Sequence, residues 1–294
     1  MWRALLESSL RRRLAPDPAW FRPRAVPVEH DVELTYLGTA GFVLRAHGRT
    51  LLLDPYVSRL GIEKLLRGPL VPDADVVTRL FPQADDVLVG HAHYDHVLDA
   101  PLICQHTGAR LIGSRAVCMV GRAAGLPNAQ LVSTAGREDL ESGALTIRGL
   151  PSKHGKVFMG RVLFPGDITE PPPWPPRIGD LKHGLVLNWL VRAGRFTMVH
   201  VDSADYVREE LEGLRADVVC LCAAGRRYRE NYVQEIVHAL RPRWVIPCHW
   251  DTMITPIEAP PQLLPGLDLP GMFDEITRAG AEPLPMNFFD RVLF

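Results

Sequence analysis

The sequence lacks the features that mark nucleic-acid-binding and membrane-spanning proteins. Its 33 basic and 34 acidic residues nearly cancel, and neither half of the chain carries a strong excess of one sign. An extended nucleic-acid-binding surface needs clustered basic residues, so no nucleic-acid partner is expected. No apolar stretch approaches the roughly 20 residues that span a bilayer, so no transmembrane segment is expected.

A secretory signal is also missing from the first residues. Three consecutive arginines, residues 11–13, follow the apolar residues of the segment, whereas a secretory signal places its charges first. We therefore expect a cytoplasmic protein. Residues 2–13 are expected to form a short amphipathic helix that packs on the body of the protein; weak contact with a membrane surface is the alternative.

Cysteine is scarce, and its spacing does not suggest a disulfide framework. The five cysteines are odd in number, and only Cys220 and Cys222 lie close together in the sequence. These two would share one face of a strand, because alternate residues point the same way. Buried thiols in a reducing cytosol are the expected state of all five.

The order of the expected elements predicts one domain of helix-covered sheets. Residues 1–30 are expected to be a lead-in, a helix followed by an irregular segment, and residues 31–294 a single domain without repeats or a long linker. Helices are expected at 205–215 and 230–240, and residues 58–80 are loop-like to helical. The expected strands are 32–37, 42–46, 50–53, 87–89, 110–113, 129–132, 144–150, 185–192, 195–201, 217–222 and 244–248.

The strongest chemical signal is the sequence His-Ala-His-Tyr-Asp-His at positions 91–96. Four side chains that can bind a metal ion lie within six residues, directly after a short buried strand. Imidazole and carboxylate groups suit zinc, iron and manganese. In an extended segment His91 and His93 would face the same way, and a turn could then direct Asp95 and His96 toward a neighbouring ion.

Four further segments belong to the same pattern, one before this motif and three after it. They are Leu-Leu-Leu-Asp-Pro at 51–55, Ser-Lys-His-Gly at 152–155, Phe-Thr-Met-Val-His-Val-Asp-Ser at 196–203 and Val-Ile-Pro-Cys-His-Trp-Asp-Thr at 245–252. In order and spacing, from about residue 32 to residue 252, the sequence resembles the metallo-β-lactamase superfamily, whose signature is His-x-His-x-Asp-His. The resemblance implies an α/β (α+β) fold, a four-layer αββα metallo-β-lactamase sandwich.

Two segments resemble one branch of the superfamily most closely. They are Tyr-Leu-Gly-Thr-Ala-Gly at 36–41 and His-Trp-Asp-Thr at 249–252. That branch includes ascorbate-6-phosphate lactonase-like enzymes and N-acyl-phosphatidylethanolamine phospholipase D.

The resemblance also implies a role for each candidate ligand. The first metal would be held by His91, His93 and His154, and the second by Asp95, His96 and His249; Asp202 would bridge both, and Asp54 would brace the site from behind. Four positions stay open. His106 or His183 could replace His154, Asp205 could replace Asp202, Asp54 could be a turn residue only, and Cys248 could be a thiolate ligand.

A site of this kind implies a hydrolase. Two divalent ions, zinc in the first place with Mn²⁺ or Fe²⁺ as alternatives, would generate a bridging hydroxide near neutral pH and polarise the substrate. Asp95 would bind metal and orient that hydroxide. The substrate is expected to be an ester, lactone, amide or phosphodiester. A non-catalytic sensor or scaffold protein with the same fold is the alternative, and the oligomeric state is not predicted.

A proline-rich segment directly after His154 is a candidate wall of the substrate pocket. Residues 164–177 carry six prolines, which exclude a helix interior or a central strand. We expect residues 155–183 to form a wall or lid over the metals, with Trp174 and Phe158 as apolar contacts and Arg161 as a contact for an anionic group. A small-molecule or lipid-like, anionic substrate would fit. The alternative is a surface loop that covers a satellite core.

Overall fold

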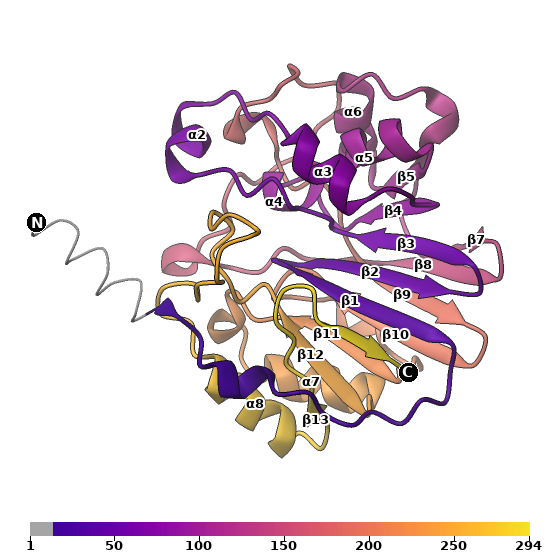
Figure 1. The fold of residues 1–294 in the computed structure, drawn as a ribbon, viewed down its shortest axis with the longest axis vertical. Coiled ribbons are helices and arrows are strands. Elements are labelled where there is room, and N and C mark those ends of the chain that lie inside the picture. The colour runs from indigo at the N-terminus through magenta and orange to yellow at the C-terminus, as the bar shows by residue number, and fades with distance from the viewer. Residues whose placement is uncertain (1–13) are drawn as a thin grey trace, which may run out of the picture.

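The computed structural model describes residues 14–294 and contains two β-sheets that lie face to face between layers of helices (Figure 1). The predicted αββα order is therefore confirmed. The first sheet consists, in spatial order, of β14 (Arg291–Leu293), β1 (Val32–Gly38), β2 (Gly41–Ala46), β3 (Arg49–Leu53), β4 (Asp86–Val89), β5 (Arg110–Gly113) and β6 (Leu131–Ser133). The second consists of β13 (Glu282–Pro283), β12 (Trp244–Cys248), β11 (Val218–Cys222), β10 (Phe196–Val201), β9 (Val186–Ala193), β8 (Leu145–Ser152) and β7 (Asp139–Ser142).

Each sheet combines an antiparallel part with a parallel part. In the first sheet β14, β1, β2 and β3 pair antiparallel, and β3, β4, β5 and β6 pair parallel. In the second, β7 to β10 pair antiparallel, and β10 to β13 pair parallel. The chain thus builds two similar halves in succession, and its last strand returns to the first sheet.

The central strands are apolar throughout because both of their faces are covered. In β3, Leu51 and Leu53 contribute to the core between the sheets, whereas Leu52 contributes to the core beneath the first helical layer. In β4, Leu88 lies in the first of these cores and Val87 in the second. Alternation thus sends successive side chains into two different apolar environments.

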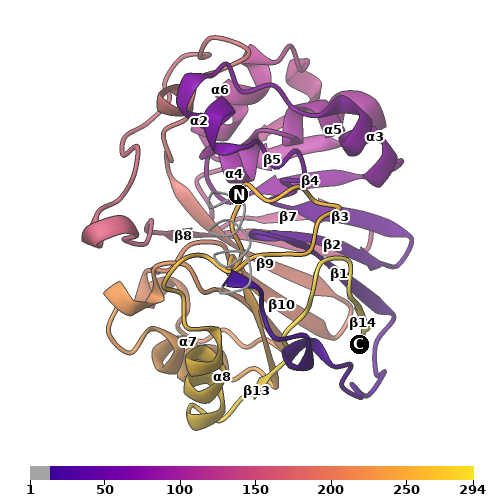
Figure 2. The ribbon, with the colours of Figure 1, turned by 60° about the vertical axis from the view of Figure 1, so that its left-hand side comes forward.

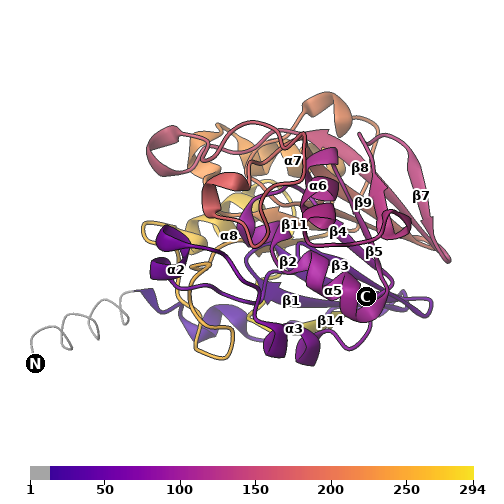
Figure 3. The same ribbon diagram turned by 90° about the horizontal axis from the view of Figure 1, so that it is seen from above.

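The helices divide between the two outer faces. Figure 3 shows the molecule from above, with the helices of the first sheet in purple and those of the second in orange and yellow. The first layer contains α2 (Ile62–Arg67), α3 (Ala74–Leu80), α4 (Tyr94–Val97), α5 (Ala100–Thr107) and α6 (Arg115–Ala123). The second contains α7 (Tyr232–Leu240) and α8 (Leu269–Arg278). Short 3-10 helices η1 to η6 lie at Pro18–Phe21, Asn128–Gln130, Phe158–Gly160, Ile178–Asp180, Arg208–Glu210 and Arg226–Tyr228.

Most predicted elements are present, with one wrong helix and some missed short strands. The predicted helix 205–215 is only a 3-10 turn at Arg208–Glu210, because Gly213 adopts a left-handed φ of 74° and interrupts the segment. β7, β13 and β14 were not predicted. They contain two to four residues each and show no apolar run that would mark them.

The remaining expectations concern the termini, the thiols and the membrane. The predicted helix 2–13 lies outside the described residues. The irregular lead-in is observed at 14–31, with one 3-10 turn. All five cysteines are buried and free. Within residues 14–294, no helix is long and apolar enough to cross a bilayer.

The parallel strands of both sheets end at one common edge of the sandwich. β3 and β4 end there in the first sheet, and β10 and β12 end there in the second; β8 runs in the same direction as β10, because both pair antiparallel with β9. This edge comes forward in Figure 2. Loops from both halves of the chain therefore meet at one place, where each delivers polar side chains.

Candidate metal centre

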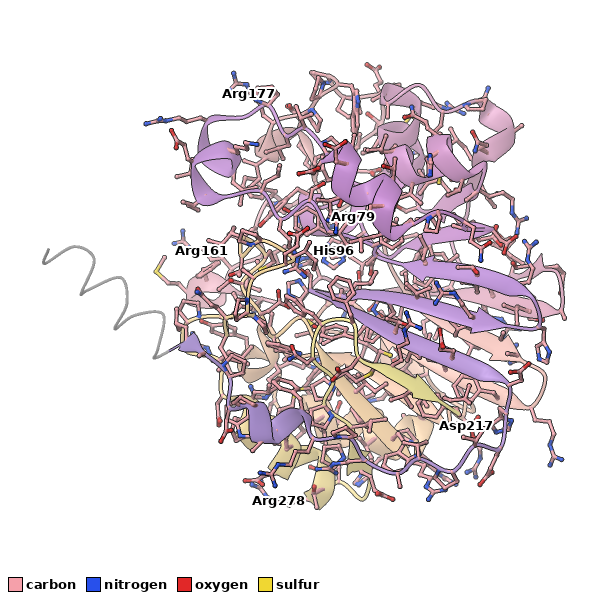
Figure 4. All side chains as sticks on the ribbon, in the orientation of Figure 1. Arg79, His96, Arg161, Arg177, Asp217 and Arg278 are labelled. Carbon is pink, nitrogen blue, oxygen red and sulfur yellow. The ribbon has the colours of Figure 1, made fainter. Side chains whose placement is uncertain are left out.

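The segment 91–96 leaves β4 and turns at once into a short helix. Gly90 separates the strand from His91, and its carbonyl accepts from the Leu187 N–H of the second sheet at 2.8 Å. His93 precedes the first turn of α4, which carries Asp95 and His96. Figure 4 shows His96 inside the molecule, where the two halves meet. One short segment thus serves two positions, as its strand-then-turn pattern predicts.

The first cluster contains His91, His93 and His154, whose candidate ligand atoms lie within 4.8 Å of one another. His154 comes from the loop after β8, and its Nδ1 donates to the Gly155 carbonyl at 2.7 Å. His93 Nε2 lies 3.4 Å from the Phe164 carbonyl, and His91 Nδ1 lies 2.6 Å from Asp202. These three hydrogen bonds leave a lone pair on the other nitrogen of each ring. Two of those nitrogens, His91 Nε2 and His93 Nδ1, approach to 3.1 Å.

The second cluster contains Asp95, His96 and His249, again within 4.8 Å. Asp95 Oδ2 lies 3.2 Å from His249 Nε2 and 3.7 Å from His96 Nε2. His249 follows β12 directly and adopts a left-handed φ of 53°. Because such a backbone conformation costs about 1–3 kcal/mol for a non-glycine residue, it indicates that the surrounding structure holds this side chain in place.

Asp202 lies between the two clusters. Its Oδ2 is 2.6 Å from His91 Nδ1 and 3.7 Å from His96 Nδ1, and these three residues form a third group of converging ligand atoms. The rival Asp205 points elsewhere and lies 3.8 Å from Arg229. Of the two carboxylates, the structure therefore brings only Asp202 to the site.

Asp54, the predicted bracing residue, lies between the backbone of Gly90 and the ring of His96. It follows β3 with a left-handed φ of 42°. Its Oδ1 accepts from the Gly90 N–H at 2.8 Å, and its Oδ2 lies 3.3 Å from His96 Nδ1. The carboxylate thus contacts both the backbone before His91 and the far side of the His96 ring, which is the usual arrangement behind a ligating imidazole.

Burial and neighbouring charges divide the histidines into two protonation classes. Burial lowers the pKa of His93 to about 4 and that of His154 to about 3, and it also lowers the pKa of His91. Burial acts in the same direction on His96, but the carboxylates of Asp54 and Asp95 raise its pKa to about 9. The first cluster is therefore neutral and ready to coordinate near pH 7, whereas His96 must lose a proton before it can.

The carboxylates respond to the same environment. Burial favours the neutral form of Asp95, but His96 and His249 hold its pKa well below the usual range. Burial and the nearby Asp54 raise the pKa of Asp202. Three buried carboxylates so close together repel one another, and a bound cation would relieve that repulsion.

The residues present fit divalent metal ions. Five imidazoles and two carboxylates converge from both sheets, which is a donor set that zinc, iron and manganese accept. Among the described residues, Asp202 Oδ1 is buried beside the clusters without a hydrogen-bond partner. Buried polar atoms rarely remain unsatisfied, so this carboxylate oxygen is consistent with a site that binds a cation.

The rival ligands His106, His183 and Cys248 lie in three different surroundings. His106 is exposed on α5, away from the clusters. His183 does reach the first cluster: its ring stacks on His154 with centroids 5.6 Å apart, and its centroid lies 5.9 Å from that of His93. Cys248 is fully buried, and burial raises the pKa of its thiol, which disfavours a thiolate.

Two residues near the centre have no role in the sequence pattern, although each lies in one of its segments. His200 is buried in β10, with Nδ1 3.7 Å from Asp54 Oδ2 and Nε2 2.9 Å from the Ala40 carbonyl. A signal for it exists, since His200 lies two residues before Asp202 on the same face of the strand. Asp251 is the second, and nothing in its spacing marks it as buried.

Residues 155–183 contact the first cluster at both ends and at Phe164. The carbonyls of Gly155 and Phe164 accept from His154 and His93, and the His183 ring stacks on His154. The middle of the segment lies against the first helical layer, where the Leu70 N–H donates to the Pro176 carbonyl and Trp174 packs on the apolar core. Phe158 and Arg161 are exposed near the start of the segment, and Figure 4 shows Arg161 farther out on the same side as His96.

The fold and its metal-binding clusters define the class of protein. Two helix-covered sheets with histidine and aspartate clusters at their shared strand ends form the metallo-β-lactamase fold. Residues 33–249 match the β-lactamase superfamily domain. In the solved structure of Igni18, a metallo hydrolase from Ignicoccus hospitalis, the similarity covers 90% of this chain and 98% of that chain, with a TM-score of 0.59. At 19% identity, it shows the fold alone.

Sequence relatives narrow the family further. A UPF0173 metal-dependent hydrolase of Anaeromyxobacter dehalogenans is 30% identical over 227 residues, which cover 75% of each chain. Another, from Methanopyrus kandleri, is 26% identical over 235 residues, 79% of this chain and 89% of that one. The chain therefore belongs to the UPF0173 metal-dependent hydrolase family of the metallo-β-lactamase superfamily.

Proposed function

We propose that this protein is a hydrolase that binds two divalent metal ions and cleaves an ester, lactone, amide or phosphodiester bond. The observation that carries the proposal is the convergence of seven donor side chains into three overlapping groups at one edge of the sandwich. Zinc suits this donor set best, and Mn²⁺ or Fe²⁺ would also fit. The names of the relatives, metal-dependent hydrolases, support the same reaction class.

Each donor has a place in this proposal. His91, His93 and His154 would hold the first ion; Asp95, His96 and His249 would hold the second, with Asp202 shared and Asp54 behind His96. When bound, two such ions lower the pKa of water and polarise the bond to be cleaved. Asp95, whose carboxylate is held ionised beside His249, would accept a hydrogen bond from the attacking water and orient it.

A non-catalytic sensor or scaffold is the second candidate, and the intact donor set argues against it. A scaffold needs neither two adjacent clusters of ligating side chains nor an ionised carboxylate beside them, and the structure has both features, with Asp95 Oδ2 3.2 Å from His249 Nε2. The resemblance of the segments 36–41 and 249–252 supports placing the chain near the lactonase and phospholipase D branch. The two segments are in contact, because the Thr39 N–H donates to Asp251 at 2.6 Å.

The substrate is proposed to be amphiphilic, with an apolar part and an anionic group. We call residues 153–164 the entry loop, because it begins beside His154 and ends at Phe164 over His93. Its tip exposes Phe158 and Met159 by 63% and 83%. Its three charged side chains are all cationic and exposed, and none of them forms an ion pair with a described residue; they are Lys153, Lys156 and Arg161.

We propose separately that Trp174 forms part of the wall of the substrate pocket. This side chain is half-buried against the first helical layer rather than exposed in the entry loop. Trp174→Ala should raise KM while metal content and melting temperature stay close to wild type if Trp174 contacts substrate. A fall in melting temperature without a change in kcat/KM would show that it only supports the core.

Wider features of the proposal rest on composition and burial. We propose a cytoplasmic location because all five buried cysteines are free and no described helix could cross a membrane. Residues 31–294 are proposed to work as one unit, because both sheets contribute ligands. No nucleic-acid partner is proposed.

The decisive experiment combines elemental analysis with a turnover screen. Protein purified without chelator should contain about two transition-metal ions per chain. It should then be screened with phosphodiesters, lactones, esters and N-acyl amides, each in anionic and neutral form. Failure to retain or take up any metal would refute the site, whereas two bound ions with no turnover of any substrate class would favour the scaffold.

The anionic part of the substrate has its own controlled test. Arg161→Glu should raise KM for the anionic form of a substrate by about tenfold, the cost of one charge-assisted hydrogen bond, and leave the neutral form unchanged. Arg195→Glu is the matched control, because Arg195 is exposed in the turn between β9 and β10, outside the entry loop. If the two variants changed KM for the anionic substrate equally, the proposed recognition of the anionic group by the entry loop would be refuted.

A further inference from the structure

A buried ion pair lies directly behind the second cluster. Asp251, two residues after His249, is fully buried and bonded to Arg59 Nη1; both side chains are almost completely inaccessible, at 0% and 1% exposure. The carboxylate also accepts from the Thr39 N–H at 2.6 Å, and its Oδ1 lies 3.4 Å from the Tyr36 hydroxyl oxygen. None of these four residues belongs to the three groups of converging ligand atoms.

Arg59 reaches this position from the opposite half of the protein. It lies in the loop after β3, five residues beyond Asp54, whereas Asp251 lies in the loop after β12. Its guanidinium donates to the carbonyls of Leu37 at 3.1 Å and Thr252 at 3.3 Å, and its Cζ lies 4.9 Å from the centroid of the Phe288 ring. The pair thus joins the loop after β3, which carries the bracing residue Asp54, to the loop after β12, which carries His249.

The surroundings are built to accept this guanidinium. A Cβ placed on Gly38 would lie 2.1 Å from Arg59 Nη2, so a side chain at this position would displace Arg59. Gly38 also has a φ of 84°, which other residues rarely adopt. Arg59 itself has a left-handed φ of 46°, so its backbone is held in an unfavourable conformation to deliver the side chain.

The same network holds the backbone of His249. The His249 N–H donates to the Thr39 carbonyl, which also accepts from the Tyr36 hydroxyl at 2.9 Å. Thr39 and His249 both have left-handed φ values, 51° and 53°. The Asp251 carboxylate fixes Thr39 from one side and Arg59 fixes the Thr252 carbonyl from the other, so the His249 backbone is bracketed on both sides.

We propose that Arg59 and Asp251 are positioning residues that set His249 against Asp95 and thereby determine the affinity of the second metal site selectively. The inference rests on the proposed function, because it assigns a role toward the second ion. The first cluster is held by other contacts, those of His93 with Phe164, His154 with Gly155 and His91 with Asp202. Loss of the pair should therefore weaken the binding of the second ion and leave the binding of the first ion unchanged.

A role in stability alone would not explain the pair. Buried ion pairs often add little net stability, because desolvation offsets the Coulomb attraction. Breaking one by removing a partner destabilises the protein all the same, so a fall in melting temperature cannot distinguish the two roles. The distinguishing quantity is the ratio of the two metal affinities.

Asp86 offers a matched control, because it lies at the start of β4, whereas the ligand segment 91–96 follows the end of that strand. Asp86 is also fully buried and binds Arg110 Nε at 2.5 Å and Ser142 of β7, so it too links the two halves through a buried carboxylate. It lies four residues before Gly90, at the start of the strand rather than at its end. Asp86→Asn removes a comparable charge without touching any loop that carries a ligand.

The experiment is a Zn²⁺ titration of metal-free protein by calorimetry, with Co²⁺ absorption as a second readout of coordination. Wild type should show two binding events. Asp251→Asn and Arg59→Met should each weaken one event by about 10–100-fold, the usual cost of losing a group that orients a metal ligand, and leave the other unchanged. Arg59→Lys should recover part of the loss, and Asp86→Asn should lower the melting temperature with both events intact.

The outcomes separate this inference from the proposed function. If wild type binds no metal, the proposed function fails. If wild type binds two ions and Asp251→Asn binds both as tightly, or loses both equally, the positioning role is wrong. Asp251→Asn preserves shape and the acceptor for Thr39, so it decides the question even if Arg59→Met does not fold.

Discussion

Gly90 offers a way to disturb the metal centre without changing any ligand. A Cβ at this position would lie 2.2 Å from Asp202 Oδ2 and 2.9 Å from the Leu187 carbonyl. Real Cβ atoms keep at least 3.0 Å from such atoms, so the carboxylate would have to retreat by roughly 0.8 Å (3.0 − 2.2). Gly90 has no left-handed φ, so Gly90→Ala tests the contact rather than backbone strain.

The retreat of Asp202 should have two measurable consequences. Overpacking in a rigid interior costs about 1–3 kcal/mol, which should lower the urea midpoint of the metal-free protein. Asp202 lies 2.6 Å from His91 Nδ1 and 3.7 Å from His96 Nδ1, so a shift of this size removes it from the position shared by the two clusters. We therefore expect both metal affinities to fall by about tenfold or more and kcat to fall with them.

Metal stoichiometry and denaturant unfolding would be measured on the same preparations. Gly61→Ala is the matched control, because nothing lies within 4 Å of a Cβ at that position and its φ is −64°. The reasoning would be refuted if Gly90→Ala bound two ions with wild-type affinity. A variant that lost stability but kept both affinities would show that Asp202 adjusts without consequence and is not the shared ligand.

Three further predictions concern catalysis and the metal-free state. Asp95→Asn should reduce kcat by at least 100-fold with little change in substrate KM, and a folded, metal-loaded variant with near-normal kcat would contradict the role of Asp95. Chelation should lower the melting temperature by about 5–10 °C, reversed by Zn²⁺, because each ion at 100 times its Kd stabilises by about 2.7 kcal/mol; an unchanged melting temperature would argue against two tightly bound ions. The free energy of unfolding of the metal-free protein should fall by a few kcal/mol as the pH falls from about 6.5 to 4. Burial lowers the pKa of His93 to about 4 and that of His154 to about 3, so both stay neutral in the folded protein but take up protons when it unfolds. Burial raises the pKa of Asp99 to about 6 and also raises the pKa of Asp202, so these two carboxyl groups oppose the trend; urea unfolding at several pH values measures the net change, and a gain in stability on acidification would contradict the prediction.

The sequence was sufficient for the parts of the centre that local pattern determines. The segment 91–96 concentrates ligands in one strand-to-turn passage, and the order of Asp54, His154, Asp202 and His249 along the chain matched a known family. The long apolar strands were equally predictable, because alternation between two buried faces leaves a continuous apolar run. Short strands such as β14 were not predictable, because three residues carry no periodic signal.

Other features depend on contacts between residues far apart in the chain. The sequence predicts Trp174 as an apolar contact for the substrate, and only the structure shows that this half-buried side chain packs on the first helical layer, because the middle of the proline-rich segment lies against residues 67–70. His183 is only a rival ligand in the sequence, and the structure stacks it on His154. Neither outcome follows from local preference, since each depends on where a distant segment lies.

By itself, the sequence determined the kind of protein: the apolar periodicity specified buried sheets, and the dense imidazole and carboxylate pattern specified a metal-binding edge. Only the tertiary structure decided which residues stand behind those ligands. Arg59 and Asp251 are 192 positions apart, and nothing in the local sequence of either predicts that the two charges meet. They become a buried pair because β3 and β12 end at the same edge of two packed sheets, where removal from water requires each charge to find the other.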